Sequence, residues 1–394
     1  MMAIRITADW IHDGYTGFKK DHLLELDDQG HILRFEQASR DELVSCRYYP
    51  GLLVPGFING HCHLELSHLC GKFNTGSRLV PFLRSVVTHR DSSQEEVMDA
   101  ILNADQIMWE GGIVAVGDIS NRTDTLEVKK RSKIHYHTFV ESFDFLQDAM
   151  ADQFYLQYKN VYDAFGDLPK SLVPHAAYSV SKTLFEKLMQ SQVEPTVLSI
   201  HNQESSDDDL LFKSGSGAYP DFWKSFGFSM DHFRPNQLDS LAYIMDHLDA
   251  KHRILFIHNT YTSAEDLRRV ETWNPESYWI TCPNANLYIE NRLPDYRVFV
   301  EQKANVAIGT DSLSSNWSLS ILSEIQTILK FNAWLDLDTV LSWATWNGAK
   351  ALGLDQTLGS IVVGKKPGIN WIQGITLVNG KPVLRNEASV KRVF

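Results

Sequence analysis

The stretch "LLVPGFINGHCH", residues 52–63, is an apolar run that ends in two histidines one residue apart. Other short apolar runs with polar ends follow along the chain. They are "GIVAVGDIS" (112–120), "KIHYHTFVES" (133–142), "SLVPHAAYS" (171–179), "TVLSIHNQES" (196–205), "RILFIHNTY" (253–261), "YWITCPNAN" (278–286) and "NVAIGTDS" (305–312). Continuous apolar strands of this kind, when helices separate them, are typical of parallel strands buried on both faces.

Amphipathic segments separate the apolar runs. They include "SSQEEVMDAILNADQIMWEG" (92–111), which opens with a serine cap, "SAEDLRRVETW" (263–273) and "LSILSEIQTILKFNA" (319–333). Eight apolar runs that alternate with such helices predict an α/β fold with a (β/α)8 barrel over residues 55–357.

The two ends of the chain have a different pattern. Residues 1–54 contain short alternating runs such as "IRITADWI", and residues 358–394 have a strand-and-turn pattern with a hairpin signal, "NGK", at 379–381. Because neither segment can build a core alone, we predict that the two together form one small β-domain, a β-sandwich, beside the barrel. The alternative is that they are two unrelated additions to the barrel.

Composition and charge exclude several classes of protein. Asp and Glu number 49 against 37 Lys and Arg, and the net charge of −12 disfavours binding to a nucleic-acid backbone. No apolar run reaches the length of about 18 residues that a membrane span needs. The N-terminus lacks the features of a signal peptide, and the four cysteines show no C-x-x-C spacing. We therefore expect a cytoplasmic protein without a membrane or nucleic-acid partner.

Chemically versatile side chains stand at the ends of five of the predicted strands. Active-site residues of a barrel lie at the carboxyl ends of its strands. The residues there are His61 and His63, His175, His201 with Glu204, His258, and Asp311. The spacing of His61 and His63 places both imidazoles on one side of a strand. Imidazoles together with a carboxylate form a nitrogen and oxygen donor set that suits Zn²⁺ or Fe²⁺.

A histidine at a strand end is more often a hydrogen-bonding core residue than a metal ligand. The chain contains a second pair with the same spacing, His135 and His137, but this pair lies at the beginning of its apolar run. We interpret that pair as structural. His61 and His63 differ because four other strand ends supply matching groups, and we favour the metal interpretation for them.

The donor set predicts a role for each residue. His61, His63, His201 and Asp311 would hold one metal, which lowers the pKa of a bound water and creates a nucleophile. Glu204, three residues after His201, would carry a proton between this water and a ring nitrogen of the substrate. His258 would hydrogen-bond the water, and Asp311 would take its proton.

The motifs "PGFINGHCH", "PHAAYS", "HNQE", "FIHN" and "GTDSLSSN" occur in the order typical of one family. From about residue 50 to 366 the chain resembles the amidohydrolase superfamily, and within it the branch of nucleoside and base deaminases and chlorohydrolases. The resemblance implies one zinc or iron ion, attack on an amine-bearing ring carbon, release of ammonia and a homodimer. Binuclear members usually carry a bridging lysine at the fourth strand end, where this chain has His175 without a lysine, so one metal is expected.

Two positions depart from the family pattern. Ala177 replaces a proline in "HAAYS", which loosens the loop that carries His175, and Gly368 replaces an aspartate in the tail, which concerns the β-domain.

The resemblance places His175 in contact with substrate. Asn286 and Asn316 are further candidate substrate contacts, although asparagine also stabilises turns by local hydrogen bonds. Glu65 either faces an amine of the ligand or caps the helix that follows.

The function that the sequence favours is hydrolytic deamination of an amino-substituted purine nucleoside or a related nitrogen heterocycle, a small-molecule substrate. A chlorohydrolase or a cyclic amidohydrolase with the same single-metal site is the alternative. A non-enzymatic binding protein is a third hypothesis, against which the presence of every candidate ligand and of Glu204 argues.

Overall fold

The computed structural model describes residues 3–235 and 237–394 of the chain. At its centre are eight strands that pair in parallel as two sheets of four, in the orders β6-β7-β8-β9 and β10-β11-β12-β13. Their bounds are β6 Phe57–Cys62, β7 Ile113–Ser120, β8 His135–Ser142, β9 Lys170–Pro174, β10 Val197–Asn202, β11 Arg253–His258, β12 Tyr278–Thr281 and β13 Val306–Ile308. Nearly every residue of these strands is buried, as the continuous apolar runs predicted.

The two parallel sheets meet at both of their edges near the carboxyl ends of the strands. At one junction the His201 amide donates to the His175 carbonyl (2.8 Å), beside a bridge between Ala176 and His201. At the other, the amides of Thr310 and Asp311 both donate to the His61 carbonyl (3.0 Å each). The prediction of an α/β fold is confirmed, and the strands lie in two ladders of four.

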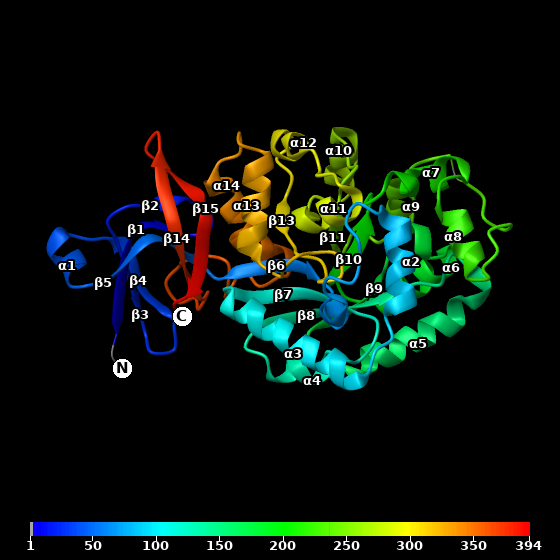
Figure 1. Cartoon of the computed structure of the whole chain (residues 1–394), viewed down its shortest axis with the longest axis horizontal. Helices are drawn as coiled ribbons and strands as arrows, with labels where there is room; N and C mark the ends of the chain where they lie inside the picture. Colours follow the sequence, from blue (N-terminus) through cyan, green and yellow to red (C-terminus); the bar gives the residue numbers. More distant parts are fainter. Residues whose placement is uncertain (1–2, 236) are drawn as a thin grey trace.

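Helices surround the parallel strands (Figure 1). The α-helices are α1 Arg40–Val44, α2 Leu79–His89, α3 Gln94–Glu110, α4 Leu126–Arg131, α5 Ala151–Ala164, α6 Lys182–Ser191, α7 Ser206–Ser214, α8 Tyr219–Ser225, α9 Ser240–His247, α10 Ala264–Trp273, α11 Pro283–Glu290, α12 Tyr296–Glu301, α13 Ile321–Phe331, α14 Leu337–Ser342 and α15 Gly348–Ala351. Short 3-10 helices span Leu64–Leu69, Asp148–Met150 and Ala177–Ser179, and a π-helix spans Trp343–Asn347.

The helices begin where their caps predict. The Ser93 hydroxyl accepts a hydrogen bond from the Glu96 amide (3.2 Å) at the start of α3. Ser263 and Asp266 form a reciprocal capping box at the start of α10. Such caps satisfy amide groups that have no partner within the helix. None of the helices in the described part of the chain is long and apolar enough to span a membrane.

The terminal segments share one seven-stranded sheet, at the left of Figure 1. Its strands are β1 Ile4–His12, β2 Phe18–Lys19, β3 His22–Leu26, β4 Ile32–Gln37, β5 Arg47–Pro55, β14 Ile369–Val378 and β15 Lys381–Arg392. The order is β15-β14-β5-β1-β3-β4, with β2 paired to β1. Asn379 and Gly380 join β14 to β15 with φ angles of 52° and 79°, as a two-residue hairpin turn requires.

The antiparallel pairing of β14 with β5 unites the two ends of the chain in this sheet. The expected β-sandwich is not seen, because these seven strands belong to a single sheet. One face of the sheet encloses a small apolar core of its own, which includes Ile6, Leu24, Leu53 and Ile369. The domain boundaries near residues 54 and 358 stay a prediction.

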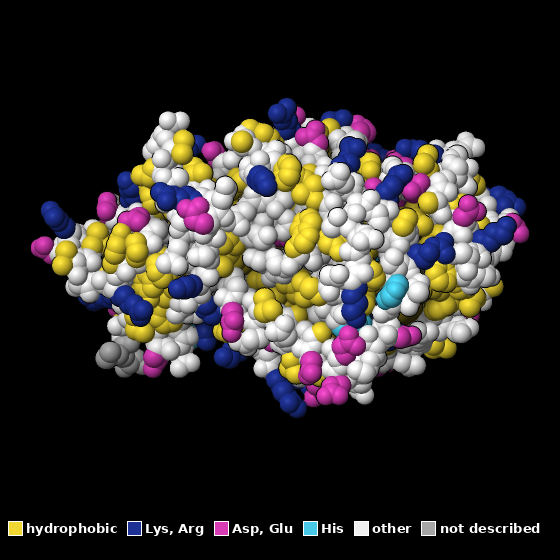
Figure 2. Space-filling view, in the orientation of Figure 1, with side chains coloured by type: hydrophobic (Ala, Val, Ile, Leu, Met, Phe, Trp, Pro, Cys, Tyr) yellow, Lys and Arg dark blue, Asp and Glu magenta, His cyan; other side chains and the backbone are white. Residues whose placement is uncertain are grey.

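Charged side chains of both signs are interspersed on the face of the molecule in Figure 2. No basic patch gathers on that face, in agreement with the net charge of −12.

Candidate metal centre and active site

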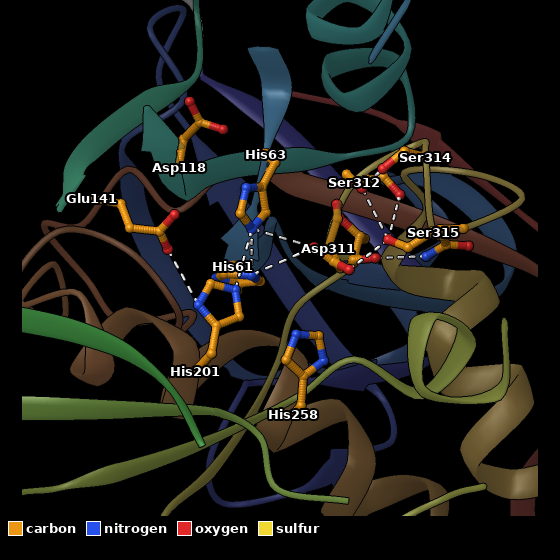
Figure 3. A network of polar contacts seen from close by, with 12 residues as sticks. His61, His63, Asp118, Glu141, His201, His258, Asp311, Ser312, Ser314 and Ser315 are labelled. Atoms are coloured by element: carbon orange, nitrogen blue, oxygen red, sulfur yellow. Dashed lines mark hydrogen bonds and ion pairs between the residues drawn. The ribbon is translucent and has the colours of Figure 1, made fainter. Parts of the chain in front are cut away.

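Three imidazoles and one carboxylate from distant parts of the chain point toward one another (Figure 3). His61 is on β6, His63 directly follows β6, His201 is on β10, and Asp311 follows β13. The Nε2 atom of His63 lies 3.1 Å from Nε2 of His61 and 3.4 Å from Nε2 of His201. The Asp311 Oδ1 atom lies 3.6 Å from His61 Nε2 and 3.5 Å from His63 Nε2. The structure thus brings together all four residues that the sequence predicted as ligands.

Four of the six separations among these donor atoms are close to those expected around a single tetrahedral metal ion. Zinc bonds to nitrogen and oxygen of about 2.0–2.2 Å place the corners of a tetrahedron about 3.3–3.6 Å apart. The measured separations of 3.1 to 3.6 Å match that spacing. Burial lowers the pKa of His61 to about 4 and that of His63 to about 3, so both imidazoles are neutral, which is the form that binds metals.

The orientation of His201 is fixed by groups behind it. Its Nδ1 atom lies 3.0 Å from the His175 carbonyl and 3.2 Å from Oε1 of Glu141. Burial alone would lower the pKa of His201, but the charge and the hydrogen bond of Glu141 outweigh it and raise the pKa to about 9. A proton on Nδ1 leaves Nε2 directed at the other imidazoles, an arrangement common among metal-binding histidines.

Sequence reasoning missed Glu141. It is buried near the end of β8, and the nearby His175 and His201 outweigh the effect of burial and hold the pKa of its carboxyl below the usual range. The signal that found the other residues, a polar group near the end of an apolar run, was present here in "TFVES". Its ligand atoms, together with those of His175 and His201, form a second cluster within 4.8 Å.

Glu204 and His258 lie beside the metal-ligand cluster. The His258 Nε2 atom is 3.6 Å from Glu204 Oε1, and its Nδ1 atom is 2.9 Å from the amide oxygen of Asn286. Because an amide oxygen only accepts hydrogen bonds, His258 carries its proton on Nδ1. Burial lowers the pKa of His258 to about 4 and raises the pKa of Glu204 well above its ordinary value. Burial therefore favours the neutral form of the imidazole and the protonated form of the carboxyl group that face each other here.

Several residues of the site have backbone angles that side chains disfavour. The φ angles are 58° at Asp311, 71° at His258, 56° at Asn259 and 44° at Gln203. Such left-handed conformations cost free energy in residues other than glycine and persist only where surrounding contacts impose them. At Asp311 the contacts are its amide, bonded to the His61 carbonyl, and its Oδ2 atom, which accepts from the Ser315 hydroxyl (2.5 Å).

Of the four predicted substrate-contact residues, only His175 lines the cavity, and the other three bind groups of the protein. His175 lines the cavity beside the metal-ligand cluster, and its Nδ1 lies 2.6 Å from the Ser179 hydroxyl. Asn286 holds His258, and Asn316 donates to the Thr310 carbonyl and to Glu324 (2.7 Å each).

Glu65 pairs with Arg90 and accepts hydrogen bonds from the amides of Asn121 (3.0 Å) and Arg122 (3.1 Å). Its carboxylate is therefore already occupied by groups of the protein. For Glu65, Asn286 and Asn316 the structure shows supporting contacts, and direct contact with substrate stays a prediction.

A cavity of about 130 Å³ opens next to the cluster. Its polar end contains His63, Glu141, His175, His201, Glu204, His258 and Asp311. Its remaining wall is largely apolar and comes from α2, α8 and the loop after β8. The side chains of this apolar wall are Leu79, Phe82, Leu83, Val86, Val87, Phe143, Phe145, Phe222 and Trp223.

The sequence profile of the Amidohydrolase family matches residues 52–393. The chain belongs to the amidohydrolase family. Among curated relatives, the adenosine deaminase of Helicobacter pylori is 30% identical over 323 residues, which cover 80% of this amidohydrolase and 77% of the relative. The aminodeoxyfutalosine deaminase of Nitratiruptor sp. is 26% identical over 351 residues, covering 83% and 81%.

Solved structures share the fold of this amidohydrolase. The Helicobacter pylori aminofutalosine deaminase in complex with methylthio-coformycin superposes with a TM-score of 0.77 at 24% identity, covering 97% of this chain and 100% of that one. A Xanthomonas campestris adenosine deaminase with bound zinc has a TM-score of 0.72 at 20% identity, covering 97% and 92%. At these identities the similarity supports the fold, and the site rests on its own geometry.

The donor geometry generates a prediction for the His63→Ala variant. Removing one of four ligands should abolish stoichiometric metal binding, because three donors hold a metal much more weakly than four. We expect one zinc per chain in the wild-type protein and far less in the variant, measured by elemental analysis after dialysis against a metal buffer.

The matched control is His135→Ala, from the other histidine pair, whose side chain is exposed. It should keep the full metal content. Full metal binding by His63→Ala would contradict the assignment.

Proposed function

We propose that this amidohydrolase is a metal-dependent hydrolytic deaminase of a purine nucleoside that carries a 6-amino group. The observation that carries the proposal is the buried carboxyl group of Glu204, which faces His258 at 3.6 Å beside the donor atoms of His61, His63, His201 and Asp311. Glu204, the candidate proton donor, thus lines the same cavity as three of the candidate metal ligands, His63, His201 and Asp311. The names of the relatives, adenosine deaminase and aminodeoxyfutalosine deaminase, support the same reaction class.

The cofactor that we propose is one divalent ion held by His61, His63, His201 and Asp311. Bound there, it would supply the Lewis acidity that makes water nucleophilic near neutral pH. Zinc is the first candidate because the nitrogen and oxygen donors have tetrahedral spacing and because a solved relative carries zinc. Iron(II) is the second candidate, since the same donor types bind it.

Each protein group then has a task in the hydrolysis. Glu204, protonated through burial, gives its proton to the ring nitrogen next to the amine-bearing carbon, which makes that carbon electrophilic. His258 and Asp311 orient the attacking water, and Asp311 accepts its proton. Asp311 then passes this proton to the amine, so that the carbon–nitrogen bond breaks and ammonia leaves, and the remaining proton of the added hydroxyl group returns to Glu204 as the carbonyl forms. The balance is one water consumed, one carbonyl formed and one ammonia released.

The specific substrate that we propose is 6-aminodeoxyfutalosine. The apolar wall from α2, with Phe82, Leu83 and Val86, supports a nucleoside with a bulky substituent on its sugar. A free terminal hydroxyl, as in adenosine, would lose its water against these side chains without gaining a partner, which is unfavourable. The name of the Nitratiruptor relative supports this choice.

We also propose that β6–β13 close into one (β/α)8 barrel, with residues 1–54 and 358–394 as a separate small β-domain. The hydrogen bonds of His201 and Asp311 across the two sheet junctions support closure. A homodimer, a cytoplasmic location and the absence of nucleic-acid partners are further proposals that rest on the sequence.

A substrate panel tests the proposed function. We expect ammonia release from 6-aminodeoxyfutalosine, with a kcat/KM more than about tenfold above that for adenosine, because differences of a few apolar groups in a pocket change kcat/KM by that order. Coupled detection of ammonia and mass spectrometry of the product would measure it. Turnover of cyclic amides or chlorinated heterocycles without turnover of any 6-aminopurine would refute the proposal and favour the alternative hydrolases.

The proton-transfer role predicts the behaviour of Glu204→Gln. The variant should keep its metal and lose kcat by about 10²- to 10⁴-fold, the usual contribution of a positioned acid or base. Single-turnover kinetics together with elemental analysis would measure both quantities. Glu186→Gln, at an exposed position of α6, is the control and should retain activity. A Glu204→Gln variant with activity within tenfold of the wild type is the result that would count against this role.

A further inference from the structure

A carboxylate interrupts the apolar stripe of helix α13. The buried side chains of Ile321, Ile325 and Ile328 follow the spacing of an inward helix face, and Glu324 occupies a position of that same face. The Glu324 side chain has no exposed surface. A buried carboxylate is unfavourable unless hydrogen-bond donors surround it, so its presence at a core position calls for a specific role.

Three donors surround Glu324, two from Asn284 in the first turn of α11 and one from Asn316 in the loop after β13. The Asn284 amide donates to Oε2 (2.9 Å), and the Asn284 side chain donates to Oε1 (3.0 Å). The Asn316 side chain also donates to Oε1 (2.7 Å). All three partners are N–H groups, so both side-chain oxygens of Glu324 must accept hydrogen bonds. A glutamine would direct an NH₂ group at another donor.

The Asn316 branch of this network leads to Asp311. The Asn316 side-chain nitrogen donates to the Thr310 carbonyl (2.7 Å) as well as to Glu324. The Thr310 amide donates to the side-chain oxygen of Asn59 (3.0 Å). These bonds fix the peptide that directly precedes Asp311, whose φ angle of 58° must be imposed by its surroundings.

The Asn284 branch leads to His258. Asn284 lies in the first turn of α11, two residues before Asn286. The Asn286 side chain contacts both the ring and the backbone of His258, with its oxygen 2.9 Å from Nδ1 and its nitrogen donating to the carbonyl (3.2 Å). The φ angle of His258 is 71°, so this residue also depends on its contacts for its conformation.

We propose that Glu324 is a positioning residue that sets Asp311 and His258 relative to each other, through Asn316 on one side and Asn284 on the other. The inference rests on the proposed function, in which these two groups orient the attacking water. Glu324 is absent from the residues that line the cavity, so it acts through the two asparagines. The alternative role, support of helix packing alone, would require no polar side chain at this position.

The Glu324→Gln variant tests the proposal by kinetics and by metal affinity. We expect kcat to fall by about 10²-fold, the effect of misplacing reacting groups by about 1 Å, while KM changes less than about threefold. The dissociation constant for zinc, measured by competition with a chelator, should rise about tenfold or more, as on loss of a group that supports a ligand.

The matched control is Ile328→Val on the same helix face. It perturbs the packing of α13 but not the network, so kcat per folded molecule and zinc affinity should equal those of the wild type. A Glu324→Gln variant that also matches the wild type in both quantities, with only a lower melting temperature, would overturn the proposal in favour of a packing role.

The pair Asn316→Ala and Glu324→Gln supplies a coupling test. If the two side chains act in one network, the double variant should lose little more zinc affinity and kcat than the more damaged single variant. If the fold-losses of the two single variants multiply in the double variant, the two side chains act independently and the proposal is overturned. Inactivity of the wild-type protein toward every 6-aminopurine would refute the proposed function instead, and the zinc measurements would still decide the role of Glu324.

Discussion

The convergence of three imidazole nitrogens and one carboxylate oxygen in a buried place is the constraint on which the rest of the structure depends. The Nε2 atoms of His61 and His201 both lie within 3.4 Å of the Nε2 atom of His63, and lone pairs at this distance repel one another unless a proton or a metal cation lies between them. Asp311 brings the one formal negative charge to this set, at 3.5 Å from His63. The electrostatics of the cluster therefore favour a divalent cation, and the surrounding contacts keep the donors in place.

Those surrounding contacts are hydrogen bonds, most of them to side chains that do not belong to the cluster. Glu141 orients His201, Ser315 and the His61 carbonyl hold Asp311, and Asn286 holds His258. The disfavoured φ angles at His258 and Asp311 show that backbone preference alone would not produce this arrangement. Hydrogen bonds at the strand ends hold His258 and Asp311 in left-handed backbone conformations that these residues do not prefer. The site is therefore preorganised.

The sequence predicted the parallel strands and the cluster because both depend on local patterns. An apolar run ending in His61 and His63 indicates a buried strand and the side that its histidines face. Glu141 carried the same local signal near the end of its apolar run, but its contact with His201, which is distant in the chain, becomes visible only in the fold. The reverse holds for Glu65, whose carboxylate is occupied by Arg90 on a segment 25 residues later. That the two ends of the chain associate was predicted, because neither end can form a core alone. They form a single sheet and not a sandwich because β14 pairs with β5, and no local sequence pattern encodes this pairing.

X-ray absorption spectroscopy at the zinc edge, on protein purified with its native metal, tests the central claim most directly. The account predicts one zinc per chain with nitrogen and oxygen neighbours at about 2.0–2.2 Å and the outer-shell scattering of several imidazoles. Cys62 and Cys282 are both buried in this part of the fold and are alternative ligands. A sulfur neighbour at about 2.3 Å, or a spectrum without imidazole scattering, would contradict the account.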